Sequence, residues 1–148
     1  MTFQPYIRAE PLIPRRIILL VEDEPFVREA TCGILESAGF QVLPADDLPQ
    51  ALQTYEEHQR KGGPRKIDLV MTDMMLSTGT GHQLAQDLRQ RSPGLAVLVT
   101  SGYPNPGFET EFPEPYLYFL AKPYSRQTLC EKINQILAPR AQAAKQAS

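Results

Sequence analysis

Residues Lys66–Gly81 read KIDLVMTDMMLSTGTG, and in this stretch a run of apolar side chains stops abruptly at Asp73. The segment Leu69–Met71 is continuously apolar, which is typical of a parallel strand that is buried on both faces. Asp73 therefore lies near the carboxyl end of a strand, and in an open α/β sheet this is the edge at which ligands bind. Because the polar and glycine-rich run 77–81 separates Asp73 from the next helical pattern, we expect a chemical role for its carboxylate rather than a helix cap.

Short apolar runs followed by helical periodicity occur about five times along the chain. The predicted strands are Ile17–Val21, Gln41–Ala45, Leu69–Met71, Ala96–Val99 and Tyr116–Ala121. The predicted helices run from Pro25 to Ala38, from Pro49 through Tyr55, from His82 to Arg91 and, with Ser125 as its N-cap, through Leu137. Repeated βα units with short loops imply a doubly wound, five-stranded parallel sheet of the α/β class, with helices on both faces.

The chain is 148 residues long, which fits one domain built around a single core. We expect an irregular N-terminal arm at residues 1–14, a domain at residues 15–138 and a flexible tail at residues 139–148. No apolar stretch reaches the roughly 18 residues that a membrane span needs, and the N-terminal residues lack a secretory signal. We therefore expect a cytoplasmic protein with no membrane partner.

Cysteine spacing and charge exclude several classes of function. Cys32 and Cys130 lack CxxC spacing, so neither a zinc site nor a disulfide framework is indicated. The net charge of −2 provides no positive field for phosphate backbones, which counts against nucleic acid as a direct partner. The basic run at residues 58–66, HQRKGGPRK, is interpreted as a solvated loop, with a docking patch for an acidic partner as the alternative.

Polar residues follow the apolar runs at four predicted strand ends: Glu22 with Asp23, Asp73, Thr100 and Lys122. If the strand order is 2-1-3-4-5, the first and third strands are neighbours less than about 5 Å apart, and three carboxylates converge. Two unit charges about 4 Å apart repel by roughly 4 kcal/mol at an effective dielectric constant of 20. Either one carboxyl group is protonated or a divalent cation lies among them, and oxygen ligands favour Mg²⁺ or Mn²⁺ over zinc.

A carboxylate beside a divalent cation, an ammonium group and a hydroxyl is suited to phosphoryl transfer. Asp73 would attack in line as the nucleophile, while the metal and Lys122 offset charge on the equatorial oxygens and Thr100 hydrogen-bonds one of them. The metal would be held by Asp23, Asp73 and a backbone carbonyl, that of Met75, with Glu22 acting partly through water.

Four segments, in this order, resemble the receiver domain of two-component response regulators. They are ILLVEDEP, LVMTDMML with Gly81 eight residues after Asp73, VLVTSGYP and FLAKPYS. The resemblance covers about residues 15–138. The SGY after Thr100 is similar in particular to receivers attached to hybrid histidine kinases.

This resemblance implies roles for the residues at the strand ends. Asp73 matches the phosphoacceptor, the pair Glu22 and Asp23 matches the metal-binding acids, and Lys122 matches the phosphate-sensing lysine, with a cis peptide bond expected between Lys122 and Pro123. The family implies a flavodoxin-like fold and Mg²⁺. It also implies a phosphoryl group received from the phosphohistidine of a kinase or a histidine phosphotransfer protein.

The family also implies a conformational switch that controls a partner protein. Thr100 matches the switch hydroxyl and Phe119 the switch aromatic, so phosphorylation would draw Thr100 inward and let Phe119 fill the vacated space. The changed surface would be that of the fourth helix, fifth strand and fifth helix. The output partner and the oligomeric state, including formation of a homodimer, are left open.

Two segments depart from the family pattern. Ser77 stands where the family usually has proline, which leaves the chemistry intact but loosens the loop after Asp73. Between Thr100 and Lys122 the sequence holds four prolines, so an ordinary fourth helix is hard to fit. We expect a shortened or irregular element near Gly107–Phe112.

Two other functions compete with a phosphoacceptor module. A haloacid-dehalogenase-like phosphohydrolase also uses an aspartyl nucleophile with Mg²⁺, lysine and Thr or Ser, but that family requires an acid where this chain has Met75. A pseudo-receiver that acts by shape alone is disfavoured by the full set of acidic, hydroxyl and lysine residues.

Overall fold

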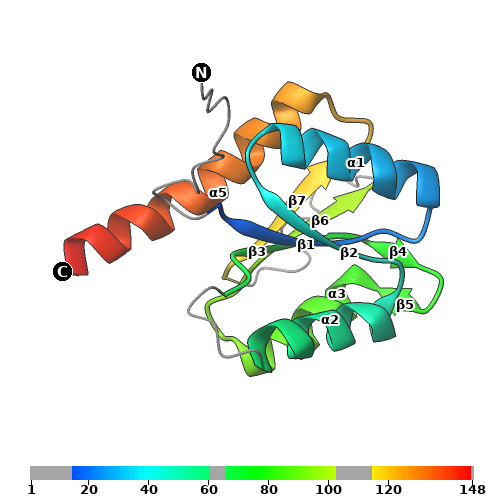
Figure 1. The fold of residues 1–148 in the computed structure, drawn as a ribbon, viewed down its shortest axis with the longest axis horizontal. Coiled ribbons are helices and arrows are strands. Elements are labelled where there is room, and N and C mark those ends of the chain that lie inside the picture. The colour runs from blue at the N-terminus through cyan, green and yellow to red at the C-terminus, as the bar shows by residue number, and fades with distance from the viewer. Residues whose placement is uncertain (1–14, 61–65, 103–114, 148) are drawn as a thin grey trace, which may run out of the picture.

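A five-stranded parallel sheet forms the centre of the computed structural model, which describes residues 15–60, 66–102 and 115–147 (Figure 1). The strand order is β2-β1-β3-β6-β7, which confirms the predicted order 2-1-3-4-5. The strands are β1 (Ile17–Val21), β2 (Gln41–Ala45), β3 (Leu69–Asp73), β6 (Ala96–Ser101) and β7 (Leu117–Ala121).

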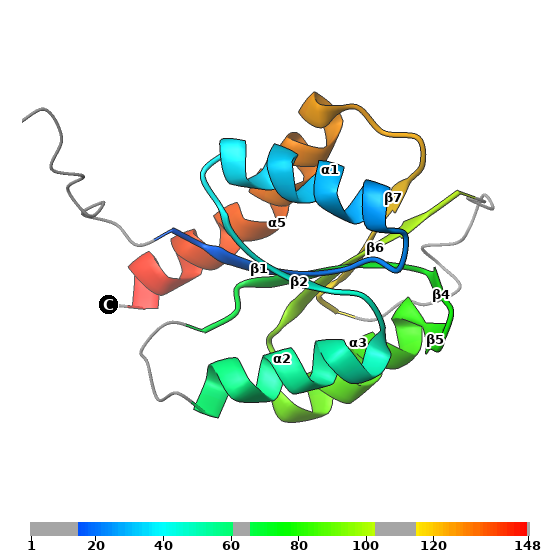
Figure 2. The same cartoon turned by 45° about the vertical axis from the view of Figure 1, so that its right-hand side comes forward.

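Helices cover both faces of this sheet (Figures 1 and 2). One face carries α1 (Pro25–Ser37) and α5 (Arg126–Ala147), and the other carries α2 (Leu48–Arg60) and α3 (Gly81–Arg91). Alternate residues of β1 belong to different core clusters: Leu19 packs with α2 and α3, while Leu20 packs with α1 and α5. Burial on both faces explains why the strands are continuously apolar.

A short hairpin follows Asp73, where the sequence predicts only a loop. It consists of β4 (Met75–Leu76) and β5 (Gly79–Thr80), which pair antiparallel around a two-residue turn. Thr80 then caps α3, because its hydroxyl accepts the backbone N–H of Gln83 while the Gln83 side chain accepts that of Thr80. This capping box confirms that Asp73 does not serve as the N-cap of α3.

The last helix is longer than its apolar periodicity predicts. The pattern ends at Leu137, whereas α5 continues through Ala147. Its start agrees with the prediction, since Ser125 Oγ accepts the backbone N–H of Thr128 at 3.0 Å. The boundary at residue 138 stays a prediction, and both the arm at residues 1–14 and the expected irregular element near Gly107–Phe112 lie outside the described residues. Among the described helices, none is long and apolar enough to span a membrane.

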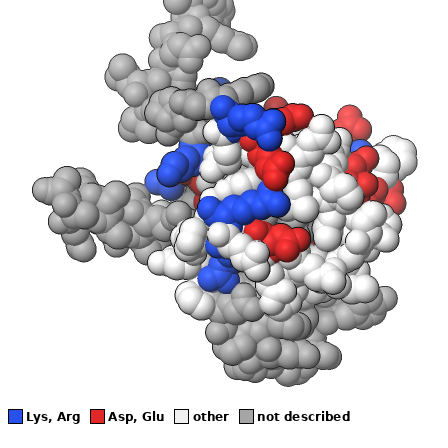
Figure 3. All heavy atoms as spheres, turned by 90° about the horizontal axis from the view of Figure 1, so that it is seen from below, with Lys and Arg blue, Asp and Glu red and all other residues white. Residues whose placement is uncertain are grey.

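Positive and negative side chains lie side by side in part of the face seen from the side of α2 and α3. Figure 3 shows lysine and arginine side chains beside aspartate and glutamate side chains, without a continuous basic surface in this view. One such pair joins the two helices, because Arg91 Nη1 forms an ion pair with Glu56 Oε1. Both side chains are largely exposed, so this pair contributes little to stability.

Candidate functional site

The strand register brings the three predicted acids together. Val21 of β1 pairs with Thr72 of β3, so Glu22 and Asp23 leave the sheet beside Asp73. One carboxylate oxygen from each acid lies within 4.8 Å of the others. The acidic cluster expected at the edge between the first and third strands is therefore present.

Lys122 faces this cluster from the end of β7. Its Nζ lies 3.0 Å from Oδ1 of Asp73 and 3.6 Å from Oε1 of Glu22. Burial alone would lower the pKa of Lys122, but the hydrogen bond to Asp73 and the charges of both acids outweigh burial and raise it. The peptide bond between Lys122 and Pro123 is cis, as the family resemblance implies.

Glu22 is the most buried acid of the cluster, with a relative exposure of 5%. Burial, followed by the charge of Asp73, raises the pKa of Glu22 to about 7, while Lys122 acts in the opposite direction. Its Oε2 atom is buried and has no hydrogen-bond partner among the described residues. An unpartnered carboxylate oxygen beside two further carboxylates fits a hard divalent cation, which prefers oxygen ligands.

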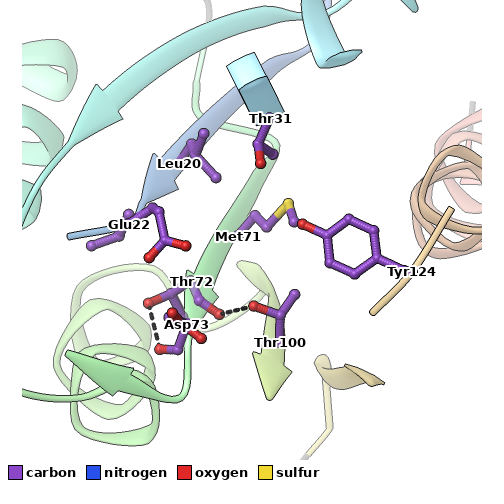
Figure 4. Close-up of a pocket in the computed structure, with 9 residues that line it drawn as sticks. Leu20, Glu22, Thr31, Met71, Thr72, Asp73, Thr100 and Tyr124 are labelled. Atoms are coloured by element: carbon purple, nitrogen blue, oxygen red, sulfur yellow. Dashed lines mark hydrogen bonds between the residues drawn. The ribbon is translucent and has the colours of Figure 1, made fainter. Parts of the chain in front are cut away.

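The predicted switch residues lie on the neighbouring strands. Asp73 pairs with Thr100 across β3 and β6, and Thr100 Oγ1 donates to the carbonyl oxygen of Thr72 at a long distance of 3.5 Å (Figure 4). Phe119 is 8% exposed and belongs to the core cluster shared by α2 and α3. Met75, whose carbonyl is the predicted additional metal ligand, follows on β4, and its side chain is exposed.

Glu22 and Asp73 line a small cavity of about 10 Å³ (Figure 4). Its lining residues are Leu20, Val21, Glu22, Thr31, Met71, Thr72, Asp73, Thr100 and Tyr124. This volume is close to the minimum that one water molecule needs. The cavity therefore has room for about one water molecule and not for a substrate.

Thr31 and Tyr124 are two residues of this cavity that the sequence analysis does not single out. Burial raises the pKa of the Tyr124 hydroxyl, while the Thr31 side chain acts in the opposite direction. Two signals could have identified them. Thr31 is a polar residue one helical turn before the buried Leu35, and Tyr124 follows closely after Lys122 in the AKPYS segment.

Gly81 lets the start of α3 approach the carboxyl end of β3. A Cβ atom on Gly81 would lie 2.5 Å from the backbone oxygen of Asp73 and 2.9 Å from Cγ2 of Thr72. We therefore expect Gly81→Ala to lower the free energy of unfolding by about 1–3 kcal/mol, since backbone must move. Urea denaturation measures this change.

Gly33→Ala in α1 is the matched control for Gly81→Ala. A Cβ atom on Gly33 meets nothing within 4 Å in the described part of the chain, and alanine is the better helix former. This control should raise the free energy of unfolding by up to about 1 kcal/mol. If Gly81→Ala stabilised the chain as much as Gly33→Ala, the close contact between Gly81 and the end of β3 would not require a glycine.

The fold and the site together define a class of protein. In this open parallel sheet of flavodoxin-like order, acids on adjacent strands face a lysine at the carboxyl ends of the strands. A family model described as the response regulator receiver domain matches residues 18–134. The chain belongs to this family, the receiver domains of two-component systems.

Named relatives agree with this assignment. The chain is 31% identical over 131 residues to the sensor kinase CckA of Brucella abortus, covering 88% of this chain and 13% of CckA. It is 30% identical over 129 residues to the phosphate regulon transcriptional regulatory protein PhoB of Escherichia coli, covering 82% of this chain and 52% of PhoB. The chain thus spans about half the length of PhoB and 13% of the length of CckA. One of these relatives is named as a sensor kinase and the other as a transcriptional regulatory protein.

A solved structure supports the same conclusion. The receiver domain of the hybrid histidine kinase CckA superposes with a TM-score of 0.67 at 32% identity, covering 82% of this chain and 98% of that structure. The predicted similarity to receivers of hybrid kinases is therefore confirmed. None of these similarities supports the phosphohydrolase alternative.

Proposed function

We propose that Asp73 accepts a phosphoryl group from the phosphohistidine of a histidine kinase or a histidine phosphotransfer protein. The observation that carries this proposal is the contact of 3.0 Å between Lys122 Nζ and Asp73 Oδ1 beside three clustered carboxylates. An Asp73 carboxylate oxygen forms a bond to phosphorus while the phosphorus–nitrogen bond breaks, and the imidazole keeps the electron pair. Lys122 then lies where it can offset charge on the transferred group.

Glu22, Asp23 and Asp73 are the residues that would hold Mg²⁺ or Mn²⁺, with the Met75 carbonyl as a further ligand. The bound metal would supply electrostatic stabilisation of the phosphoryl oxygens. Protonation of Glu22 lowers the negative charge of the cluster when no cation balances it, which agrees with its raised pKa. Metal binding is therefore expected to release a proton from Glu22 near neutral pH.

We propose that phosphorylation is read out through Thr100 and Phe119, and that the switch controls a partner protein. The existing bond from Thr100 to the Thr72 carbonyl is long and weak, so the hydroxyl can exchange it for a phosphoryl oxygen. Movement of Thr100 would let the Phe119 ring shift toward the vacated space. The domain would also assist its own dephosphorylation without acting as a turnover enzyme.

Incubation with acetyl phosphate tests this function. In the presence of Mg²⁺ we expect a mass increase of one phosphoryl group on an aspartyl peptide containing Asp73, and no increase when EDTA replaces Mg²⁺. Beryllofluoride with Mg²⁺ should shift the amide resonances of residues next to Asp73 and Thr100. Multiple turnover of a phosphomonoester, or no response to either reagent, would contradict the proposal.

A further inference from the structure

The turn of the β4–β5 hairpin contacts a member of the acidic cluster directly. The backbone N–H of Ser77 donates to Oδ2 of Asp23 at 3.1 Å, across 54 positions of the sequence. Asp23 is partly exposed at the start of the loop after β1. Packing alone therefore does not fix the orientation of its carboxylate, and the bond from Ser77 supplies a constraint.

The hairpin is itself held in place from two sides. The backbone N–H of Leu48, the first residue of α2, donates to Oγ1 of Thr78 at 3.0 Å. Thr80 is tied into the capping box of α3, and Leu76 is buried in the core. Because both neighbours of the turn are anchored, the Ser77 N–H is a fixed donor rather than one that follows Asp23.

We propose that the backbone N–H of Ser77 is a positioning group that holds Asp23 ready to bind a divalent cation. This inference rests on the proposed function, in which Asp23 is a metal ligand. A carboxylate offers about four lone-pair sites on two oxygens, so a bond to Oδ2 leaves Oδ1 available. Fixing the carboxylate before the metal arrives lowers the ordering cost of binding.

Thermodynamic linkage extends the proposal to the hairpin. If the Ser77 bond favours the metal-bound state, then metal binding must stabilise the Ser77 bond by the same factor. The turn also contacts the start of α2 through Thr78, so metal binding to the acidic cluster would also stabilise this contact with the helix. The loop that lacks the usual proline is thus used as a support for Asp23.

Two substitutions at one position separate the backbone donor from the side chain. Ser77→Pro removes the N–H, and Ser77→Ala keeps the N–H while removing the hydroxyl. Titration of the whole chain with Mg²⁺ in a calorimeter should give a dissociation constant for Ser77→Ala within about twofold of the wild type. For Ser77→Pro we expect binding about 10-fold to 100-fold weaker, the usual effect of removing a support for a metal ligand.

A second measurement covers the case in which proline disrupts the hairpin. Lactic acid incorporated at position 77 replaces the N–H by an ester oxygen without adding a ring, and it is compared with Ser77→Ala. It should weaken Mg²⁺ binding as Ser77→Pro does. In the wild type, hydrogen exchange at the Ser77 amide should slow when Mg²⁺ is added.

The outcomes separate this inference from the function on which it rests. Failure of the wild type to bind Mg²⁺ would overturn both. If the ester variant binds Mg²⁺ as tightly as Ser77→Ala or more tightly, while the wild type binds Mg²⁺ normally, only the role of Ser77 is overturned. If Ser77→Ala weakens Mg²⁺ binding as much as Ser77→Pro does, the effect belongs to the hydroxyl, and the proposal is also overturned.

Discussion

Replacement of Asp73 by asparagine is expected to abolish phosphoryl incorporation from acetyl phosphate. The amide is a far weaker nucleophile than the carboxylate, and it also removes the partner that Lys122 contacts at 3.0 Å. We expect labelling at least about 1,000-fold below the wild type, measured by mass spectrometry of the intact chain after incubation with Mg²⁺. The loss should be complete because the structure presents Asp73, and not Glu22 or Asp23, to the Lys122 ammonium at hydrogen-bond distance.

Asp87→Asn is the matched control, because Asp87 is an exposed carboxylate on α3 outside the acidic cluster. It should be labelled at the wild-type rate. Asp73→Asn should remain folded, since removing one of three clustered charges relieves repulsion with Glu22. Labelling of a folded Asp73→Asn variant at a substantial rate would move the acceptor to another acid.

Strand positions and the acidic cluster could be predicted because they follow from strong signals. Continuous apolar runs such as Ile17–Val21 mark strands buried on both faces, and the carboxyl ends of parallel strands meet at one edge. Placing Glu22 beside Asp73 then required only that the first and third strands be neighbours. The residues at this edge were therefore located from order along the chain, with no knowledge of side-chain geometry.

Other features gave no readable signal. Each strand of the β4–β5 hairpin has two residues, which is too short to show a period of two, and its turn Ser77–Thr78 is read as loop. The bond from Ser77 to Asp23 depends on where that turn packs against α2, which is a tertiary effect. The extension of α5 beyond Leu137 was missed because the apolar pattern that predicts a helix stops there.

The pH dependence of the free energy of unfolding should reveal that Glu22 is protonated in the folded chain. Its pKa is about 7 in the folded chain, against an ordinary value of 4.5, so the folded state binds more protons between these two values. The contribution of Glu22 to the free energy of unfolding is therefore fully present below about pH 4.5, falls as the pH rises and is lost above about pH 7. The full shift corresponds to roughly 3 kcal/mol, and urea denaturation in EDTA at pH 5 to 8 measures its effect.

Glu22→Gln should remove this pH dependence and make the metal-free chain more stable than the wild type at pH 8. The neutral amide keeps the shape of the side chain and ends repulsion with Asp73, although it also ends the attraction to Lys122, 3.6 Å away. Since burial and Asp73 raise the pKa against the effect of Lys122, the net change favours the variant. At saturating Mg²⁺ the wild type should be the more stable of the two, because the Glu22 carboxylate strengthens metal binding and the neutral amide does not.

Glu29→Gln, an exposed position on α1, should keep the wild-type slope and serves as the control. Equal slopes for the wild type and Glu22→Gln between pH 5 and 8 in EDTA would mean that Glu22 is ionised throughout this range. Lys122 would then already balance the cluster, and a cation would add little. The difference in slope between the wild type and Glu22→Gln therefore tests whether burial and the charge of Asp73 keep Glu22 protonated in the absence of a metal ion.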